Sequence, residues 1–464
     1  MRDFSALIKA YDVRGVVPDQ WDSELAAQVG TAFVEVLGIR SSDGGAGRIV
    51  VGHDMRPTGP DLVAAFINGV TAAGVDVINI GLCSTDGLYF ASGKLDIPGA
   101  MFTASHNPAE YNGIKMCRAG ASPVGQDTGL ADIRHMLEVE EFPAYEGPIG
   151  TASSQDMLAD YAQHLRNLVP LEGIRELSVV IDTGNGMGGY TVPAVLGGQI
   201  LTALPLKIDE MYFELDGSFP NHEANPIDPE NLRDLQKRVL EVGADIGLAF
   251  DGDADRCFVV DEKGQIVDPS TLTSLIATRE LAKHPGSTII HNLITSKAVP
   301  EIVQEHGGVP VRTRVGHSFI KATMAETGAV FGGEHSGHFY FRDFWKADSG
   351  MLAAMHALAA LGETTEGTSL STLLTPFTRY VSSGEINTKV SDAKSVTANI
   401  EKIFAARGAQ FDKLDGLTVT GPTWWFNVRA SNTEPLLRLN VEGNDLAAME
   451  AIRDEVLALM KDKI

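Results

Sequence analysis

The chain has few cysteines, and their spacing forms no recognisable pattern. Only 3 of its 464 residues are cysteine, and Cys83, Cys117 and Cys257 lie far apart in the sequence. An odd number at such spacing fits neither a disulfide framework nor a zinc-binding motif. Cysteine usage therefore favours a reducing compartment, and we expect a cytoplasmic protein.

Positive charge and long apolar runs are also scarce. The sequence holds 37 lysines and arginines against 61 aspartates and glutamates, a net charge of −24. Binding to a nucleic-acid backbone needs a basic surface, so no nucleic-acid partner is expected. No apolar run approaches the roughly 18 residues of a membrane-spanning helix, so no membrane partner is expected either. A small anionic substrate remains compatible with this charge if the few cations converge on one site.

What the chain does contain is an alternation of β-rich and helical segments. Residues 48–54 (RIVVGHD) are typical of a strand, 60–74 have a helical period, and 75–81 (VDVINIG) again resemble a strand. This order predicts a βαβ unit with parallel strands. Two more cycles of strands and helices follow before the pattern changes near Thr368.

Chain length and element order together predict a four-domain α/β protein. We expect three consecutive mixed α/β domains plus a smaller C-terminal α+β domain around a central cleft. The predicted boundaries are 1–148, 149–256, 257–367 and 368–464.

A reactive serine follows one of the predicted strands. Residues 101–113 read MFTASHNPAEYNG, which places Ser105 beside His106 in a tight loop. No G-x-S-x-G elbow is present, and neighbours in an extended turn are expected to point in different directions, so no hydrolase triad is predicted. The serine alone is compatible with a nucleophile, a phosphorylation site or a turn former.

Three aspartates follow the predicted strand 245–250 at alternate positions. In DGDADR (251–256), Asp251, Asp253 and Asp255 would repel one another unless a cation neutralised them, and their oxygens suit Mg²⁺ or Ca²⁺. An EF-hand is excluded because Arg256 occupies the position that needs glycine and strands flank the loop. The alternative is a solvated acidic turn.

A glycine-rich segment resembles a dinucleotide fingerprint but lacks its context. DTGNGMGG (182–189) contains G-x-G-x-x-G after a predicted strand. A dinucleotide site needs a helix next and an acidic residue at the end of the following strand. Pro193 makes a long helix doubtful, and the next strand, predicted over 200–207, ends in Lys207. The sequence favours a plain glycine-rich turn over an NAD site.

Two later loops collect polar side chains. GGEHSGH (332–338) could present Glu334, Ser336 and His338 to sugar hydroxyls, or form an ordinary hairpin turn. RASNTEP (429–435) places Arg429 beside Ser431, Asn432 and Thr433. Such a cluster suits a phosphate dianion, or again a simple turn.

Taken together, these segments resemble the motifs of the α-D-phosphohexomutase family, most closely its bacterial phosphomannomutase/phosphoglucomutase branch. The matching segments span nearly the whole chain in order: YDVRG (11–15), TASHNP (103–108), DGDADR (251–256), GEHSGH (333–338) and RASNTEP (429–435). TASHNP and DGDADR together are specific, whereas each loop alone is weak.

The resemblance implies an intramolecular phosphotransferase of the isomerase class. It would interconvert hexose 1-phosphate and 6-phosphate (mannose and/or glucose) through a phosphoserine and a bound 1,6-bisphosphate, which also serves as activator. One Mg²⁺ per chain would be held by Ser105, Asp251, Asp253 and Asp255. The implied catalytic residues are Ser105, His106, Lys115, Arg256, His317 and Arg14, with Lys115 or His317 moving the sugar hydroxyl proton. The implied substrate-binding residues are Tyr11, Glu334, Ser336, His338, Arg429, Ser431, Asn432 and Thr433.

One position departs from the family pattern, and several alternatives stay open. Some relatives carry a lysine where this chain has Ile294, and Lys297 lies three positions later. The closest alternative activity is a phosphoglucosamine mutase, followed by a Mg²⁺-dependent sugar phosphatase and a phosphosugar-binding protein without activity. No pattern in the sequence predicts the sugar preference or the oligomeric state.

Overall fold

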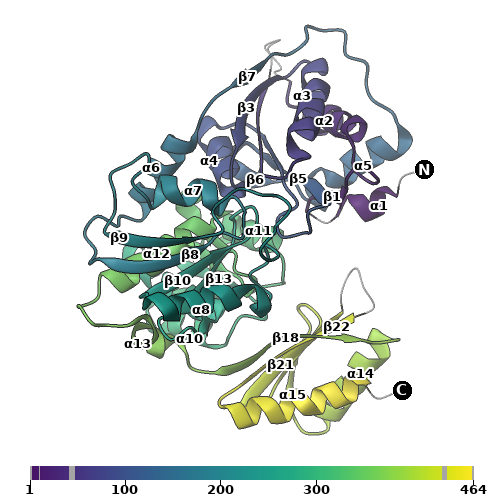
Figure 1. Cartoon of the computed structure of the whole chain (residues 1–464). Coiled ribbons are helices and arrows are strands. Elements are labelled where there is room, and N and C mark those ends of the chain that lie inside the picture. The colour runs from purple at the N-terminus through teal and green to yellow at the C-terminus, as the bar shows by residue number, and fades with distance from the viewer. Residues whose placement is uncertain (1–2, 10, 41–46, 431–435, 462–464) are drawn as a thin grey trace. The chain divides into compact units, whose positions relative to one another are not determined.

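The computed structural model describes residues 3–9, 11–40, 47–430 and 436–461, apart from the side chains of His317 and Ser318 (Figure 1). These residues form two compact units. Unit 1 comprises Met1–Pro269 and Ser336–Leu373, and unit 2 comprises Ser270–His335 and Leu374–Ile464. The four predicted domain boundaries stay a prediction.

The first sheet of unit 1 has the strand order β1-β5-β4-β2-β3-β7, with β6 paired to β5. Its strands are β1 (Val13–Val16), β2 (Arg48–His53), β3 (Asp76–Leu82), β4 (Gly99–Phe102), β5 (Tyr111–Arg118), β6 (Ser122–Pro123) and β7 (Ala152–Ser154). Its helices are α1 (Phe4–Leu7), α2 (Ser23–Leu37), α3 (Gly59–Ala72), α4 (Thr85–Leu95) and α5 (Leu130–Val139). Strand β2 pairs in parallel with both β3 and β4, which confirms the predicted βαβ unit.

The core of this part lies between the sheet and the helix pair α2 and α3, which run side by side (Figure 1). Phe66 of α3 lies 6.1 Å from Phe33 of α2 and 5.3 Å from Phe102 of β4, measured between ring centroids. Burying one such ring stabilises the fold by about 2 kcal/mol. Strand β4 is thereby fixed just before the loop that carries Ser105.

The second sheet of unit 1 has the order β12-β11-β10-β8-β9. It consists of β8 (Leu177–Asp182), β9 (Leu206–Met211), β10 (Ile246–Phe250), β11 (Cys257–Asp261) and β12 (Ile266–Val267), with α6 (Leu158–Leu168), α7 (Gly188–Val195) and α8 (Arg233–Val242). Strands β8, β9 and β10 are parallel, whereas β10 and β11 form an antiparallel pair. Unit 1 also contains β16 (Phe339–Phe341), β17 (Ala347–Asp348) and α12 (Gly350–Gly362).

Residues 183–187 of the glycine-rich segment form a turn, as predicted, but Gly188 and Gly189 begin helix α7, and the strand expected after the segment was misplaced. Helix α7 has 8 residues and contains Pro193. Strand β9 runs over Leu206–Met211 rather than over 200–207, so it does not end in Lys207. Its bounds follow its register with β8, where Leu206 faces Leu177. A Cβ atom at Gly186 would lie 2.7 Å from the carbonyl oxygen of Gly252, so the glycine allows this turn to pack against the aspartate loop.

Unit 2 contains a parallel group of strands and an antiparallel sheet. Strands β13 (Thr288–Asn292), β14 (Val309–Thr313) and β15 (Phe331–Gly333) are parallel and are accompanied by α9 (Pro269–Lys283), α10 (Ala298–Glu305) and α11 (His317–Thr327). The second sheet has the order β18-β22-β21-β20-β19 and is antiparallel throughout. Its strands are β18 (Val381–Lys389), β19 (Gln410–Asp412), β20 (Leu417–Thr420), β21 (Trp424–Ala430) and β22 (Leu436–Gly443).

Helices α14 (Ala393–Ala405) and α15 (Leu446–Lys461) cover one face of this antiparallel sheet (Figure 1). The remaining helical elements are α13 (Leu370–Leu374) and the 3₁₀ turns η1 (Ala119–Ala121), η2 (Gln126–Thr128), η3 (Pro229–Leu232), η4 (Arg342–Phe344) and η5 (Thr375–Phe377). The predicted fold class, three mixed α/β parts and a smaller C-terminal α+β part, is confirmed.

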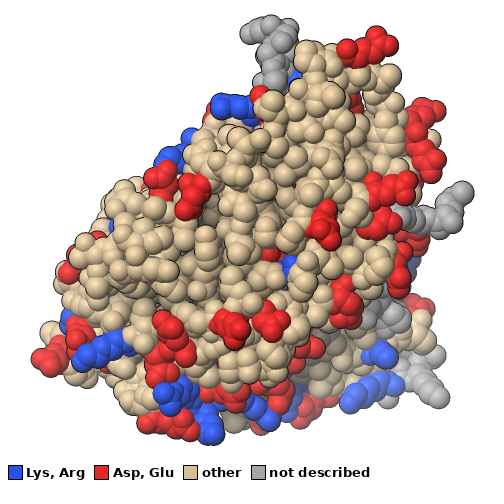
Figure 2. Space-filling model, turned by 45° about the horizontal axis from the view of Figure 1, so that its top comes forward, with Lys and Arg blue, Asp and Glu red and all other residues tan. Residues whose placement is uncertain are grey.

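The surface carries more acidic than basic side chains, in line with the net charge of −24. On the face shown in Figure 2, acidic side chains are scattered over the surface and basic side chains form only small groups. Within the described ranges, no helix combines the length and the apolar character needed to cross a membrane.

Candidate active site

The aspartate loop joins the antiparallel strands β10 and β11 and is buried. Asp251 and Asp253 are 0% exposed and Asp255 is 1% exposed. One carboxylate oxygen from each lies within 4.8 Å of the others. Burial excludes the solvated acidic turn, because solvent does not reach these carboxylates. Buried carboxylates repel one another unless cations compensate them.

Two cations of unit 1 partly compensate these charges. Lys115 Nζ donates to Asp253 Oδ2 at 2.7 Å and to Asp255 Oδ2 at 2.6 Å. Arg256 Nε donates to Asp251 Oδ2 at 2.7 Å. Burial raises the pKa of Asp251 to about 7 in spite of Arg256. Burial also opposes ionisation of Asp253, but Lys115 more than offsets it, so the pKa of Asp253 lies well below its usual range.

The carboxylate cluster fits a hard divalent cation. Asp253 Oδ1 is buried and accepts no hydrogen bond from any described residue. A carboxylate oxygen in this situation is costly unless a cation binds it. Three converging carboxylates offer only oxygen ligands, the set that Mg²⁺ prefers. The predicted metal residues Asp251, Asp253 and Asp255 are therefore brought together.

Ser105 lies directly against this cluster. Its side chain is buried, and its Oγ donates to Asp251 Oδ2 at 3.0 Å. Arg256 Nη2 lies 3.4 Å from the same Oγ. The backbone of Ser105 has a φ of 50°, a left-handed conformation that aims the side chain at the aspartate loop.

The predicted separation of the two neighbouring side chains is wrong. His106 Nδ1 lies 3.2 Å from Ser105 Oγ, because the positive φ of Ser105 turns the chain sharply. However, Arg256 Nη2 also contacts this Nδ1 and can only donate to it. Burial, reinforced by the charge of Arg256, lowers the pKa of His106 to about 2. His106 is thus a poor base for Ser105, and a hydrolase arrangement is not formed.

A buried arginine that the sequence did not single out supports the serine loop. Arg56 is 1% exposed, and its guanidinium group donates to the carbonyl oxygens of Ser105 and Asn107 at 3.0 and 2.6 Å. Asp54, also buried, pairs with Arg56 at 3.3 Å. Both residues follow β2, which pairs in parallel with β4, so their place at a shared strand end was the available clue. Arg14 adds a hydrogen bond to Asn107 Oδ1 at 2.5 Å.

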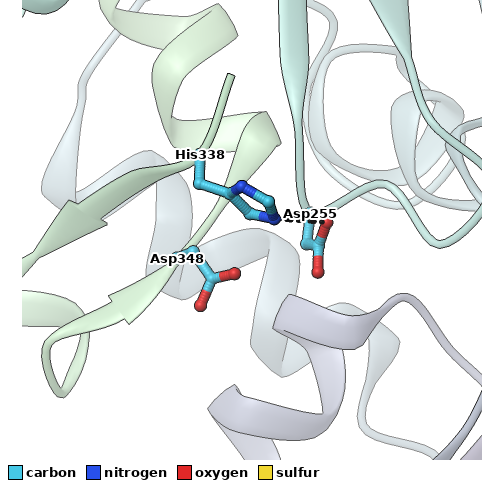
Figure 3. A group of neighbouring side chains, drawn as sticks. All are labelled: Asp255, His338 and Asp348. Carbon is cyan, nitrogen blue, oxygen red and sulfur yellow. Dashed lines mark ion pairs between the residues drawn. The ribbon is translucent and has the colours of Figure 1, made fainter. Parts of the chain in front are cut away.

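His338 and Asp348 approach the aspartate loop from the hairpin of β16 and β17. Figure 3 shows both side chains directed toward Asp255. His338 Nε2 lies 3.6 Å from Asp255 Oδ1, and Ser336 Oγ lies 2.9 Å from His338 Nδ1. Ligand-type atoms of Asp255, His338 and Asp348 lie within 4.8 Å of one another. The predicted residue His338 therefore lies beside the aspartate loop. Its neighbour Asp348 was missed because it is a lone acid within an unremarkable strand.

Glu334 lies at the end of β15 in unit 2. It is 2% exposed, and its Oε1 accepts hydrogen bonds from Asn292 Nδ2 at 3.3 Å and from the amide of Gly316 at 3.2 Å. A Cβ atom at the preceding Gly333 would lie 2.4 Å from Thr273 Oγ1. Close packing of the loop thus requires this glycine and fixes the glutamate.

The other predicted residues are placed less completely. Arg429, near the end of β21, donates to Glu385 Oε2 at 3.2 Å. Ser431, Asn432 and Thr433, like the side chain of His317, lie outside the described residues. Tyr11 is partly buried before β1. Lys297 precedes α10, and its side chain is 55% exposed with Nζ 3.7 Å from Glu301.

Four family models match consecutive parts of the chain. They describe the phosphoglucomutase/phosphomannomutase alpha/beta/alpha domain I over residues 5–143, domain II over 159–264, domain III over 268–380 and the C-terminal domain over 385–459. Together they span all the loops discussed above.

Similar proteins cover nearly the full length. A phosphomannomutase of Salmonella montevideo is 39% identical over 97% of this chain and 98% of its own length. A relative from Xanthomonas campestris pv. campestris, named as phosphohexose mutases, is 40% identical over 98% of both chains. The crystal structure of a phosphoglucomutase/phosphomannomutase family protein from Burkholderia thailandensis has a TM-score of 0.86 at 32% identity, covering 99% of this chain and 98% of that one. The chain therefore belongs to the phosphoglucomutase/phosphomannomutase family and is a phosphohexomutase, an enzyme of the isomerase class.

Proposed function

We propose that this phosphohexomutase interconverts hexose 1-phosphate and hexose 6-phosphate, with mannose or glucose as the sugar, through a phosphoserine at Ser105 and a bound hexose 1,6-bisphosphate. One observation carries the proposal. Ser105 Oγ lies 3.0 Å from Asp251 Oδ2 inside a buried cluster of carboxylates and cations. A hydroxyl so placed can exchange a phosphoryl group while water is kept away.

Asp251, Asp253 and Asp255, together with Ser105, would hold one Mg²⁺. When bound, this cation would neutralise charge that develops on the transferring phosphoryl group. Arg256, which lies 3.4 Å from Ser105 Oγ, would bind the same phosphate from the protein side. These roles agree with the ones that the sequence resemblance implied.

The contacts of Lys115 argue against the proton-transfer role that the resemblance implied for it. Burial opposes the charge of Lys115, but the two aspartates to which it donates hydrogen bonds outweigh burial and raise its pKa well above the usual range. A lysine held in its charged form is a poor general base, so we assign it to charge compensation. His338 lies beside Asp255 and Asp348, and we propose that it accepts the proton of the attacking sugar hydroxyl.

Two groups of residues would hold the substrate. Glu334, Ser336 and His338 would bind sugar hydroxyls, because they combine acceptors and donors in one loop. Arg429 with Ser431, Asn432 and Thr433 would bind the phosphate that does not react. Arg14, which donates to Asn107 in the serine loop, would assist substrate binding together with Tyr11. The bisphosphate must present either end to Ser105, so both groups must accept two orientations.

The test is phosphopeptide mapping of the full chain before and after incubation with glucose 1,6-bisphosphate and Mg²⁺. We expect one phosphate on Ser105, and 6-phosphate product from mannose 1-phosphate or glucose 1-phosphate. Ser105→Ala should lose both, whereas Ser122→Ala, a change at an exposed serine, should lose neither. Release of free phosphate as the main product would point to a phosphatase instead. A marked preference for glucosamine 1-phosphate would point to a phosphoglucosamine mutase.

A further inference from the structure

A threonine at the start of helix α4 holds one of the loop aspartates. The amide of Thr85 donates to the carbonyl oxygen of Asp253 at 3.0 Å. Its hydroxyl donates to Asp253 Oδ2 at 2.5 Å. Thr85 is 0% exposed, so water cannot replace either bond. This residue belongs to none of the segments that the sequence analysis singled out.

These bonds determine which carboxylate oxygen of Asp253 stays available. Oδ2 accepts from both Thr85 and Lys115, whereas Oδ1 accepts no hydrogen bond from the residues that the structure describes. A carboxylate fixed through one oxygen presents the other in a defined direction. Hydrogen bonds to the ligands of a metal commonly fix their orientation and strengthen binding in this way.

The residue after Thr85 anchors the start of α4. Asp86 is 0% exposed, and its carboxylate accepts hydrogen bonds from three hydroxyl groups. These belong to Ser84, to Tyr161 at 2.7 Å and to Ser349 at 2.6 Å. Ser84 and Ser349 are also the N-terminal caps of α4 and α12. Tyr161 belongs to α6, so one carboxylate joins three helices that are distant in sequence.

We infer that Thr85 is a positioning residue for the metal ligand Asp253, and that the buried junction around Asp86 fixes the helix start from which Thr85 acts. The inference rests on the proposed function, because it takes Asp253 as a metal ligand. Thr85 orients a carboxylate and touches no reacting atom in this arrangement. Its loss therefore affects metal binding and turnover more than substrate affinity.

The experiment compares Thr85→Val with Thr85→Ser in the full chain. Mn²⁺ binding is followed by the electron paramagnetic resonance signal of the free ion, and kcat and KM are measured with saturating Mg²⁺. Thr85→Val removes a hydrogen bond to a charged group. We therefore expect it to weaken Mn²⁺ binding about tenfold and to lower kcat about tenfold. KM for hexose 1-phosphate should stay within about twofold, and Thr85→Ser should restore both affected quantities.

Thr191→Val is the matched control, because Thr191 is also buried and, among the residues that the structure describes, its hydroxyl donates only to the carbonyl oxygen of Met187. It should bind Mn²⁺ like the wild type. Tyr161→Phe removes one hydroxyl from the junction and should weaken Mn²⁺ binding by about threefold. Normal binding by Tyr161→Phe would overturn the role of the junction.

Asp253→Asn separates failure of this inference from failure of the proposed function. If Asp253→Asn loses Mn²⁺ binding but Thr85→Val keeps both binding and kcat, the positioning role is overturned and the metal site stands. A lower melting temperature of Thr85→Val with normal Mn²⁺ binding would overturn it equally. If Asp253→Asn itself binds Mn²⁺ normally, the proposed metal site is wrong.

Discussion

The guanidinium group of Arg56 donates a hydrogen bond of 3.0 Å to the main-chain carbonyl oxygen of Ser105. The same group donates to the carbonyl oxygens of Asn107, Pro108 and Tyr111 at 2.6 to 2.8 Å. Ser105 has a φ of 50°, a backbone conformation that costs a non-glycine residue about 1 kcal/mol or more. One buried side chain thus stabilises a strained turn that presents the serine.

Arg56→Lys should therefore impair catalysis. An ammonium group cannot donate to all of these carbonyl oxygens at once, because it lacks the planar, forked geometry of a guanidinium group. We expect kcat to fall at least about tenfold, with less phosphate on Ser105 after incubation with bisphosphate. Arg134→Lys, in an exposed ion pair with Glu138, should change neither quantity. Wild-type kcat in Arg56→Lys would show that the turn keeps its shape without the guanidinium group.

Removing the cation beside the aspartate loop should make the fold depend on metal. Lys115→Met leaves Asp253 and Asp255 without their shared partner, and an uncompensated buried charge costs about 3 kcal/mol or more. We expect a lower melting temperature without Mg²⁺ and a larger rise on adding Mg²⁺ than in the wild type. Lys94→Met, at an exposed ion pair, is the control. An Mg²⁺-induced rise equal to that of the wild type would contradict this role of Lys115.

Asp86 should make stability depend on pH. Burial raises its pKa to about 6, although three hydroxyl groups oppose this shift. The folded protein then binds this proton more tightly than the unfolded chain. The stabilisation is complete below the unfolded pKa of about 4 and is lost as the pH rises through about 6.

Replacing Asp86 with asparagine removes this titration. The melting temperature of the wild type relative to Asp86→Asn should rise as the pH falls from about 7 to about 5. Comparing the two proteins at each pH cancels the contributions of the other carboxylates. A difference that is constant with pH would show that Asp86 does not titrate in this range.

The sequence predicted the parts of the site that lie within short segments. Ser105 and the three aspartates stand in compact motifs at strand ends, where short apolar runs make the strands recognisable. Thr85 could not be found in this way. It is a common residue type, and its partner Asp253 is 168 positions away.

Backbone conformation and strand register account for the predictions that were wrong. The contact between His106 and Ser105 depends on a positive φ at a serine, and no pattern of residues in the sequence predicts this conformation. The start of β9 depends on its register with β8, a tertiary constraint that overrides the local sequence. Contacts over long sequence distances and unusual dihedral angles are therefore what the sequence alone leaves open.

Glu385, the ion-pair partner of Arg429, should compete with the proposed substrate for the Arg429 side chain. Arg429 Nη2 donates to Glu385 Oε2 at 3.2 Å, and Glu385 also accepts from Arg438 at 3.1 Å. If Arg429 binds the phosphate that does not react, the carboxylate of Glu385 competes with that phosphate for the same guanidinium group. Arg429→Ala should then raise KM for hexose 1-phosphate about tenfold or more, with a smaller change in kcat.

Glu385→Gln should have the opposite effect and lower KM by about threefold, because the neutral amide competes less well than a carboxylate. The double variant decides whether this effect passes through Arg429. With Arg429 already replaced by alanine, the glutamine should bring no further gain, since the two residues are in direct contact and their effects are coupled. An equal gain in both backgrounds would mean that Glu385 acts as a general negative charge and that Arg429 is not its route to the substrate.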